Sequence, residues 1–185
     1  RALVADPVDR PVLVGARARQ HVLEEVFCYK AFRLHQSGII ETLLSCPEID
    51  QVVVDTDSPL ILEGLQKDFP QVTCLIRPEH LRADTIPTNE ILMHDTAQVP
   101  ADLYLQTHST NPLLKAATIS RAIQALLKEY PAYDSLFGVT RLQTRLWDQL
   151  GRAVNHNPAV LLRTQDLPPL FIENSNFYVF TPSLL

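Results

Sequence analysis

Short apolar runs rich in β-branched residues alternate with helical segments along most of this sequence. The apolar runs predict buried strands at 49–54, 72–76, 102–106, 135–140 and 177–180. Segments with helical periodicity or helix start signals lie between them, at 60–68, 88–96 and 116–130. This alternation is typical of α/β proteins in which helices cover a sheet. We therefore predict a three-layer, Rossmann-like α/β fold with a largely parallel sheet.

In such folds ligands bind beyond the carboxyl ends of the strands, so the residues that follow each strand are site candidates. These stretches are rich in polar side chains and lie at 55–58, 77–88, 107–112 and 140–145. Arg77 follows its strand directly, and a guanidinium there suits a phosphate or the O2 edge of a pyrimidine. An ion pair between Arg77 and Asp84 is the alternative. Asp55 and Asp57 are expected to cap the helix at 60–68. Thr88 is expected to cap the helix at 88–96 and to face an anion at that helix N-terminus.

A second polar stretch, at 106–111, precedes the clearest helix. Its hydroxyls and amides suit a sugar or a base, and an ordinary N-capped turn is the alternative. Residues 141–176 fit the alternation poorly, which predicts an excursion from the sheet that serves as a lid or an oligomerisation arm. Residues 20–35 favour a helix.

Composition excludes several classes of protein. The 185 residues suit a single domain spanning 1–185, and the net charge of -5 argues against binding a nucleic-acid backbone. No apolar run is long enough for a membrane-spanning helix. Cys28, Cys46 and Cys74 fit neither a disulfide framework nor a zinc site. With no secretory leader at the start of the sequence, they indicate reduced thiols and a cytoplasmic location.

The motifs of other chemistries are missing from the sequence. The six histidines lack zinc-binding spacings, and there is neither a Gly-x-Ser-x-Gly elbow nor a Gly-x-Gly-x-x-Gly dinucleotide motif. Because the chain has only five glycines, a phosphate site in it would rely on side chains and helix N-termini.

Five segments carry a resemblance through their order and spacing. They are Thr56-Asp57 at a strand end, Arg-Pro-x-x-Leu-x-x-Asp-Thr at 77–85, Thr-Asn-Pro-Leu at 110–113, Arg-x-Gln-Asp-Leu-Pro at 163–168 and Glu-Asn-x-x-x-Tyr-x-Phe at 173–180. Together they resemble the acylneuraminate cytidylyltransferase family, which comprises CMP-sialic acid synthetases and relatives for legionaminic and pseudaminic acids. The likeness covers residues 46–180 and implies a nucleotidyltransferase-type fold.

The resemblance also implies a reaction. The anomeric hydroxyl of a nonulosonic acid attacks the α-phosphate of CTP, giving the CMP-sugar and pyrophosphate, with Mg²⁺ as cofactor. It places Arg77 and Thr88 against the nucleotide. It places Gln106, His108 and Thr110 beside the sugar acid.

Two further implications concern assembly. Gln165 is expected near the sugar site or a dimer arm. Residues 141–176 resemble the family's dimerisation element, which reaches into the partner's active site, so a homodimer is expected.

The sequence departs from the family at both ends. The family's Pro-Ala-Arg-Gly-Gly-Ser-Lys loop has only a partial counterpart in Gly15-Ala16-Arg17, so residues 1–36 are divergent and Arg17 is the candidate catalytic and nucleotide-binding residue. The family's magnesium ligands include an Asp-x-Asp pair beyond the late aromatic strand. The sequence stops at Leu185, before that point, so we assign no metal ligand.

Two alternatives stay open. The chain is either an active enzyme or a degenerate, inactive domain that keeps the fold as a binding or interaction module. Among active enzymes, a 3-deoxy-octulosonate cytidylyltransferase usually has an Asp in the turn after the third strand. That turn, 107–111, contains no acid here, which favours the acylneuraminate branch.

Overall fold

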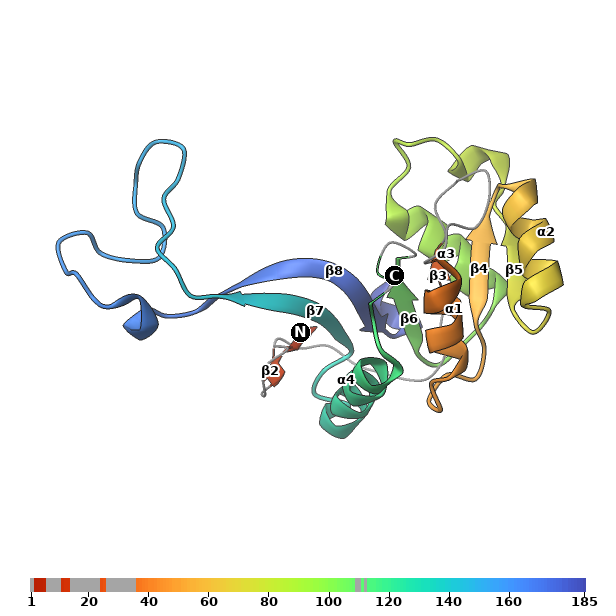
Figure 1. The fold of residues 1–185 in the computed structure, drawn as a ribbon, viewed down its shortest axis with the longest axis horizontal. Helices are drawn as coiled ribbons and strands as arrows, with labels where there is room; N and C mark the ends of the chain where they lie inside the picture. Colours follow the sequence, from red (N-terminus) through yellow and green to blue (C-terminus); the bar gives the residue numbers. More distant parts are fainter. Residues whose placement is uncertain (1, 6–10, 14–23, 26–35, 109–110, 112) are drawn as a thin grey trace.

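The computed structural model describes residues 2–5, 11–13, 24–25, 36–108, 111 and 113–185, in which strands and helices alternate as the sequence predicts (Figure 1). The strands are β1 (Ala2–Ala5), β2 (Pro11–Leu13), β3 (Glu24–Glu25), β4 (Val53–Thr56), β5 (Thr73–Ile76), β6 (Tyr104–Thr107), β7 (Ser135–Leu142) and β8 (Leu170–Phe180). The α-helices are α1 (Gln36–Leu44), α2 (Pro59–Asp68), α3 (Thr88–Gln98) and α4 (Ala116–Glu129). Short 3-10 helices are η1 (Glu79–Leu81), η2 (Thr164–Asp166) and η3 (Pro182–Leu184).

The described strands pair into two sheets, with the orders β2-β1-β7-β8-β6 and β3-β4-β5. The two sheets lie side by side, because β3 also contacts β6 (Figure 1). Strand β1 is parallel to β7, and β3, β4 and β5 are parallel to one another. Strand β8 runs antiparallel to both of its neighbours, β6 and β7, and β2 is antiparallel to β1. The arrangement is therefore mixed, with β8 between two strands that run the same way.

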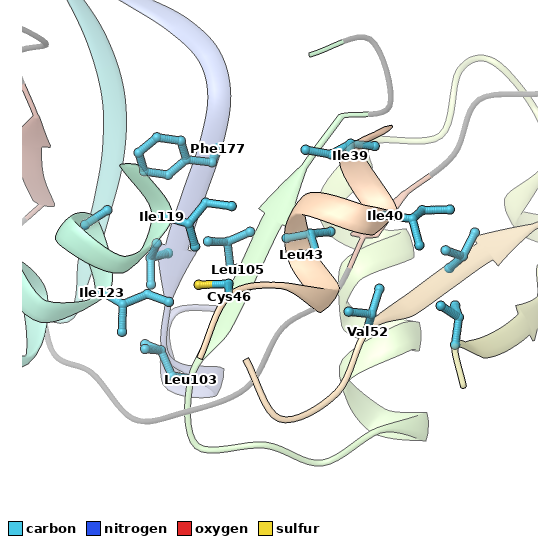
Figure 2. Close-up of a cluster of buried hydrophobic side chains, with 14 of the residues drawn as sticks. Ile39, Ile40, Leu43, Cys46, Val52, Leu103, Leu105, Ile119, Ile123 and Phe177 are labelled. Carbon is cyan, nitrogen blue, oxygen red and sulfur yellow. The ribbon is translucent and has the colours of Figure 1, made fainter. Parts of the chain in front are cut away.

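The main core lies on one face of these strands (Figure 2). It joins apolar side chains of α1, α2 and α4 to those of β4, β6 and β8, among them Ile39, Leu43, Val54, Leu65, Leu105, Ile119, Ile123 and Val179. Burial of the predicted apolar face of α4 confirms the helical pattern read from the sequence. On the other face, Leu92 of α3 packs with Val53, Tyr104 and Phe180. Helices thus cover both faces, which confirms the three-layer α/β fold.

Strands β7 and β8 form a long ribbon that leaves the body of the molecule (Figure 1). They pair from Ser135 opposite Phe180 to Leu142 opposite Leu170. We call residues 139–173, the outer part of this ribbon with its connecting loops, the arm. The excursion predicted at 141–176 exists, but its boundaries are wrong. Residues 141–142 pair with 170–171, and Ile172 and Glu173 continue the ladder, so part of the predicted excursion belongs to β7 and to the first half of β8.

Three other local predictions are wrong, and one helix was not predicted. Strand β4 continues through Asp55 instead of ending before it, because that carboxylate is buried in an ion pair. Thr88 is the first residue of α3 and Pro87, in an extended conformation, is the N-cap. Glu24–Glu25 is a strand, not part of a helix, and the rest of 20–35 lies outside the described residues. The sequence reading also missed α1, whose buried Ile39, Ile40 and Leu43 belong to the main core.

None of the helices in the described ranges is long and apolar enough to cross a membrane. Cys46 is a buried free thiol and Cys74 a partly buried one, while Cys28 lies outside the described residues. Burial raises the pKa of both described thiols.

Candidate functional site

A pocket of about 450 Å³ lies beside the first turn of α3. Three of the predicted site residues meet in its wall: Thr88 from α3, and Gln106 and His108 from β6 and the turn that follows. Strands β7 and β8 and the C-terminal residues Leu184 and Leu185 complete the lining. A concave, largely preformed space with a few convergent polar groups is the usual form of a small-molecule site.

Side chains on the pocket face lie in two rows across β6, β8 and β7. The first row is Tyr104, Phe180 and Ser135, and the second is Gln106, Tyr178 and Phe137. The rings of Tyr104 and Phe180 stack with centroids 5.7 Å apart, and those of Phe137 and Tyr178 with centroids 6.3 Å apart. The pocket therefore has a rigid aromatic floor.

Gln106 is the most deeply placed polar group of this pocket. The residue is only 4% exposed, and it lines the pocket. A side-chain amide that faces a pocket can supply a ligand with both a donor and an acceptor.

The N-terminus of α3 supplies the positive end of the pocket. The N-cap residue, Pro87, makes no side-chain capping hydrogen bond, and Thr88 and Asn89 in the first turn line the pocket. The first N–H groups of a helix carry partial positive charge and favour anions. The described lining residues include no Lys or Arg, and among them the N–H groups at this helix end favour an anion.

One carboxylate, that of Glu173, lies in the described lining of the pocket. The Tyr178 hydroxyl donates a hydrogen bond to Glu173 Oε1, and it also lies 3.2 Å from Ser175 Oγ. Burial raises the pKa of Tyr178, and the hydrogen bond to Glu173 raises it further. Tyr178 therefore keeps its proton at neutral pH and holds Glu173 in place as a donor.

A bulge in β8 brings Glu173 to this position. The register jumps from Phe137 opposite Tyr178 to Val139 opposite Glu173, so Gly138 faces four residues of β8. Ser175 in the bulge has a φ of 51°, in the left-handed region. A Cβ at Gly138 would lie 2.7 Å from Asn174 Oδ1, so any larger residue there would have to displace the Asn174 side-chain amide.

The end of β6 and the turn that follows it hold this bulge in place through hydrogen bonds to its backbone. Thr107 Oγ1 donates to the Asn176 carbonyl at 2.8 Å, and Asn111 Nδ2 donates to the Ser175 carbonyl at 3.1 Å. These bonds join the strand end that carries Gln106 and His108 to the segment that carries Glu173. The pocket is thus supported by hydrogen bonds outside its own lining.

Arg77 lies elsewhere, in an ion pair between β5 and β4. Its Nε donates to Asp55 Oδ2 at 2.5 Å, and the Asp55 carboxylate is fully buried. Burial raises the pKa of Asp55, while the adjacent guanidinium counteracts this. Arg77 also accepts a hydrogen bond from Arg82 Nε on its carbonyl, at 2.8 Å. These contacts hold the carboxyl ends of two neighbouring strands together.

Comparison with known proteins places this architecture in a family. The family described as Cytidylyltransferase matches residues 37–184, which is most of the chain. The chain belongs to the cytidylyltransferase family. No curated protein matches its sequence.

Solved structures share the fold of this cytidylyltransferase family member. A CMP:2-keto-3-deoxy-manno-octonic acid synthetase complexed with CTP superposes with a TM-score of 0.64 at 14% identity, over 89% of this chain and 75% of that one. A 4-diphosphocytidyl-2C-methyl-D-erythritol synthase gives 0.60 at 14% identity, over 90% and 77%. The corresponding synthase from Anaerococcus prevotii gives 0.59 at 13% identity, over 90% and 71%. At these identities the likeness establishes the fold, including the nucleotidyltransferase-type architecture, and does not identify the substrate.

The predicted site residues do not all lie together in this family member. Thr88, Gln106 and His108 share the pocket, whereas Arg77 does not line it. Gln165 is exposed in η2 on the arm, where its carbonyl accepts a hydrogen bond from Gln143 Nε2 at 3.2 Å. Arg17 and Thr110 lie outside the described residues.

Sequence reasoning did not include Glu173, Tyr178 or Asn111 in the site. The motif that contains Glu173 and Tyr178 was recognised, but its register against β6 was not. The available signal was the alternation of Tyr178 and Phe180, which predicts two aromatic rings on one face of a strand.

No group of three or more His, Cys, Asp or Glu side chains in the described ranges could hold a metal ion. The pocket contributes one carboxylate, and it is hydrogen-bonded to Tyr178. The described residues therefore do not form a magnesium site by themselves.

Proposed function

We propose that this chain transfers CMP from CTP to a sialic-acid-like nonulosonic acid and releases pyrophosphate. Membership of the cytidylyltransferase family supports the donor nucleotide. The resemblance of its motifs to those of acylneuraminate cytidylyltransferases supports the acceptor. The proposed reaction joins the anomeric oxygen of the acid to the α-phosphorus of CTP and breaks the bond from that phosphorus to the bridging oxygen of pyrophosphate.

The pocket's charge is the observation that favours a sugar acid over a sugar phosphate. The synthases for 4-diphosphocytidyl-2C-methyl-D-erythritol make a product with two phosphates, one of which comes with CMP, so their acceptor carries a phosphate. A phosphate dianion is usually held by Arg or Lys. The described lining has neither and includes Glu173, while the N-terminus of α3 suits a single carboxylate.

The pocket residues would act by positioning. Gln106 and His108 would hold the sugar above the aromatic floor, and Thr88 would face the junction between acceptor and nucleotide. Fixing two reactants in line removes much of the entropic barrier to a bimolecular reaction. We also propose that Thr110, next to this turn, contacts the acceptor, and that Gln165 acts at the acceptor site of a second copy.

The nucleotide side of the site rests on three proposed contributions. Arg17 would neutralise the triphosphate, and the Thr88 hydroxyl would contact the nucleotide. Arg77 would contribute by holding the ends of β4 and β5 in register through Asp55, which makes its effect on CTP partly indirect. Mg²⁺ is proposed as the companion of CTP, since this ion is commonly held by substrate phosphates with one or two carboxylates.

The test is pyrophosphate release by the purified chain with CTP, with ATP, GTP and UTP as controls. The acceptor panel contains several nonulosonic acids, 2-keto-3-deoxy-manno-octonic acid and 2C-methyl-D-erythritol 4-phosphate. Release with CTP and a nonulosonic acid supports the proposal. Release with CTP and one of the other acceptors would identify that acceptor, in place of a nonulosonic acid, as the substrate. CTP binding by calorimetry without release from any acceptor would identify the chain as a degenerate domain.

We further propose that two copies pair through the arm. The arm exposes an unusual number of large apolar side chains for a surface segment: Trp147, Leu150, Val154, Val160, Leu161, Leu162 and Ile172. A ribbon that projects from the body can reach a neighbouring molecule (Figure 1). Sedimentation equilibrium should find a dimer, and the double variant Leu150→Glu, Leu161→Glu should be monomeric with unchanged secondary structure. A wild-type monomer at high concentration would contradict this.

A further inference from the structure

Helix α3 runs antiparallel to β6 across the pocket. The Tyr104 hydroxyl, at the start of β6, accepts a hydrogen bond from the Ala101 N–H at 2.8 Å and donates one to the Val99 carbonyl at 3.0 Å. Val99 is the C-cap residue of α3, so the C-terminal end of this helix lies beside Tyr104. The N-terminus of α3, with Thr88 and Asn89, therefore lies toward the carboxyl end of β6.

The polar side chains of the pocket gather at that same end. His108 follows the last residue of β6, and Glu173 lies one step along the strand ladder beyond the row that contains Gln106. The Tyr178 hydroxyl is directed there too, because it donates to Glu173. The carboxyl end of β6 thus collects most of the polar groups in the described lining: Thr88, Asn89, Gln106, His108 and Glu173.

The other end of the pocket has an apolar wall. Phe180 lies one row from Gln106 toward the start of β6, which is about 7 Å along the strands. Leu92 belongs to the same buried cluster as Phe180, and Leu185 packs against that cluster. Ser135, opposite Phe180, is the one polar side chain of the described lining here. The apolar side chains at this end are Leu92, Phe180, Leu184 and Leu185.

We propose that this apolar end selects a nonulosonic acid whose side chain ends in a methyl group over one that ends in a hydroxymethyl group. This inference rests on the proposed function and narrows its substrate class. The reacting end of the acceptor faces the nucleotide, which Thr88 is proposed to contact, so the far end of the acceptor lies against Phe180 and Leu184. A terminal hydroxyl there loses its hydrogen bonds to water, whereas a methyl group is stabilised by burial.

Ser135 defines the group next to that methyl. The residue is 9% exposed and lines the pocket in the same row as Phe180. Its hydroxyl can donate one hydrogen bond and accept others. A side chain that carries one hydroxyl on the carbon beside its terminal methyl satisfies both the apolar wall and Ser135. The preferred acceptor is therefore a deoxy acid that keeps this inner hydroxyl and lacks the terminal one.

Steady-state pyrophosphate release with a matched pair of acceptors tests the proposal. The pair is N-acetylneuraminic acid, which ends in a hydroxymethyl group, and its analogue that lacks only the terminal hydroxyl. Wild type should use the deoxy analogue with a kcat/KM about 10–100-fold higher, the range over which an apolar pocket rejects an added hydroxyl. The KM for CTP should be nearly the same with both acceptors. Equal kcat/KM values for the two acids would overturn the inference and leave the proposed function standing.

A variant at the apolar end shows whether this end sets the preference. Leu184→Asn changes a half-exposed side chain to an amide of similar size. The amide offers a terminal hydroxyl a hydrogen-bonding partner, so the preference for the deoxy acid should fall to about threefold or less. Leu127→Asn makes the same change at a partly exposed leucine of α4, the helix on the main-core face, and should keep the wild-type preference. A wild-type preference in Leu184→Asn would overturn the assignment.

Ser135→Ala tests the inner hydroxyl. It should lower kcat/KM for both acids about threefold to tenfold, as expected for one lost neutral hydrogen bond, without changing the preference between them. An unchanged kcat/KM would overturn this contact.

Absence of pyrophosphate release with every acceptor would contradict the proposed function itself. Calorimetry with the same two acids then decides the inference. Tighter binding of the deoxy acid would support it, and equal binding, or no binding of either acid, would overturn it.

Discussion

The Arg77 guanidinium donates to the buried carboxylate of Asp55 at 2.5 Å, across the parallel pair of β5 and β4. Removing one partner of such a pair leaves an uncompensated charge in the interior. We therefore expect Asp55→Ala and Arg77→Ala each to lower the free energy of unfolding by about 3–5 kcal/mol. Urea denaturation followed by circular dichroism measures the change.

The surface pair Arg152 and Asp148 is a matched control with similar geometry, 2.6 Å, but an exposed arginine. Arg152→Ala should cost much less than either change at the buried pair, because solvent screens the interaction. Equal effects at the two pairs would show that burial does not strengthen the Arg77 interaction. Any loss of CTP affinity in Arg77→Ala should be measured where the variant is fully folded, since a nucleotide role and a structural role both predict weaker binding.

Gln106→Leu separates binding from stability in the pocket. Because Gln106 lines the pocket and belongs to neither apolar core cluster, an apolar replacement of similar size should change the free energy of unfolding by no more than about 0.5 kcal/mol. The acceptor KM should rise about tenfold, the equivalent of roughly 1.4 kcal/mol of lost hydrogen bonding. A large loss of stability with unchanged KM would mean that the amide is structural.

Ser175→Gly should make the protein more stable. Its φ of 51° lies in the left-handed region, where a residue with a Cβ is disfavoured by about 1–2 kcal/mol. Glycine removes this penalty but loses the contact with Tyr178 and has more entropy when unfolded, so we expect a net gain of about 0.5–1 kcal/mol. Ser175→Ala keeps the strained backbone without the hydroxyl and should be no more stable than wild type. Thermal unfolding distinguishes the two variants.

Gly138→Ala should have the opposite effect on the other side of the same bulge. The added methyl would lie 2.7 Å from Asn174 Oδ1, so the Asn174 amide has to move and gives up its hydrogen bond from the Asn176 N–H, which costs about 1 kcal/mol. In an Asn174→Ala background the obstructing oxygen is gone, so the cost of Gly138→Ala should shrink. A double-mutant cycle measured by chemical unfolding gives the coupling, and additive effects would contradict the close contact.

Glu48 provides a test by pH. It accepts hydrogen bonds from Ser120 Oγ at 2.6 Å and Gln124 Nε2 at 2.7 Å, both on α4. The Ser120 hydrogen bond holds the pKa of Glu48 below its ordinary value. The folded state therefore binds fewer protons here than the unfolded state. The stabilisation from Glu48 is complete above the pKa of this residue in the unfolded state, about 4.3. It is lost as the pH falls through the lower pKa that Glu48 has in the folded state.

Ser120→Ala should accordingly raise the pKa of Glu48 and reduce stability at pH 7 by about 1 kcal/mol or less, since the pair is partly solvated. The difference from wild type should shrink in acid, where Glu48 is protonated in both proteins. Carboxyl titration by NMR measures the pKa, and urea unfolding across the same pH range measures the stability. A difference that stays constant with pH would assign the effect to packing of Ser120.

The sequence by itself determined the elements whose residues carry a strong periodic signal. The helices at α2, α3 and α4 were located because apolar side chains recur at helical spacing or start signals precede them, and β5 and β7 because β-branched residues cluster. Three of the proposed site residues, Thr88, Gln106 and His108, were found because they follow strands or begin a helix, and these positions meet at one edge of an α/β sheet.

Tertiary structure decided the rest. Whether Arg77 faces a ligand or a buried Asp55 depends on the pairing of β4 with β5, which no local pattern encodes. The first half of β8 forms because β7 supplies a hydrogen-bonded partner, although its polar residues resemble a loop. The position of Glu173 depends on a bulge whose register is fixed by contacts with Thr107 and Asn111, more than 60 residues earlier. Local periodicity reports which face of an element is buried, whereas register and long-range pairing are set by the fold as a whole.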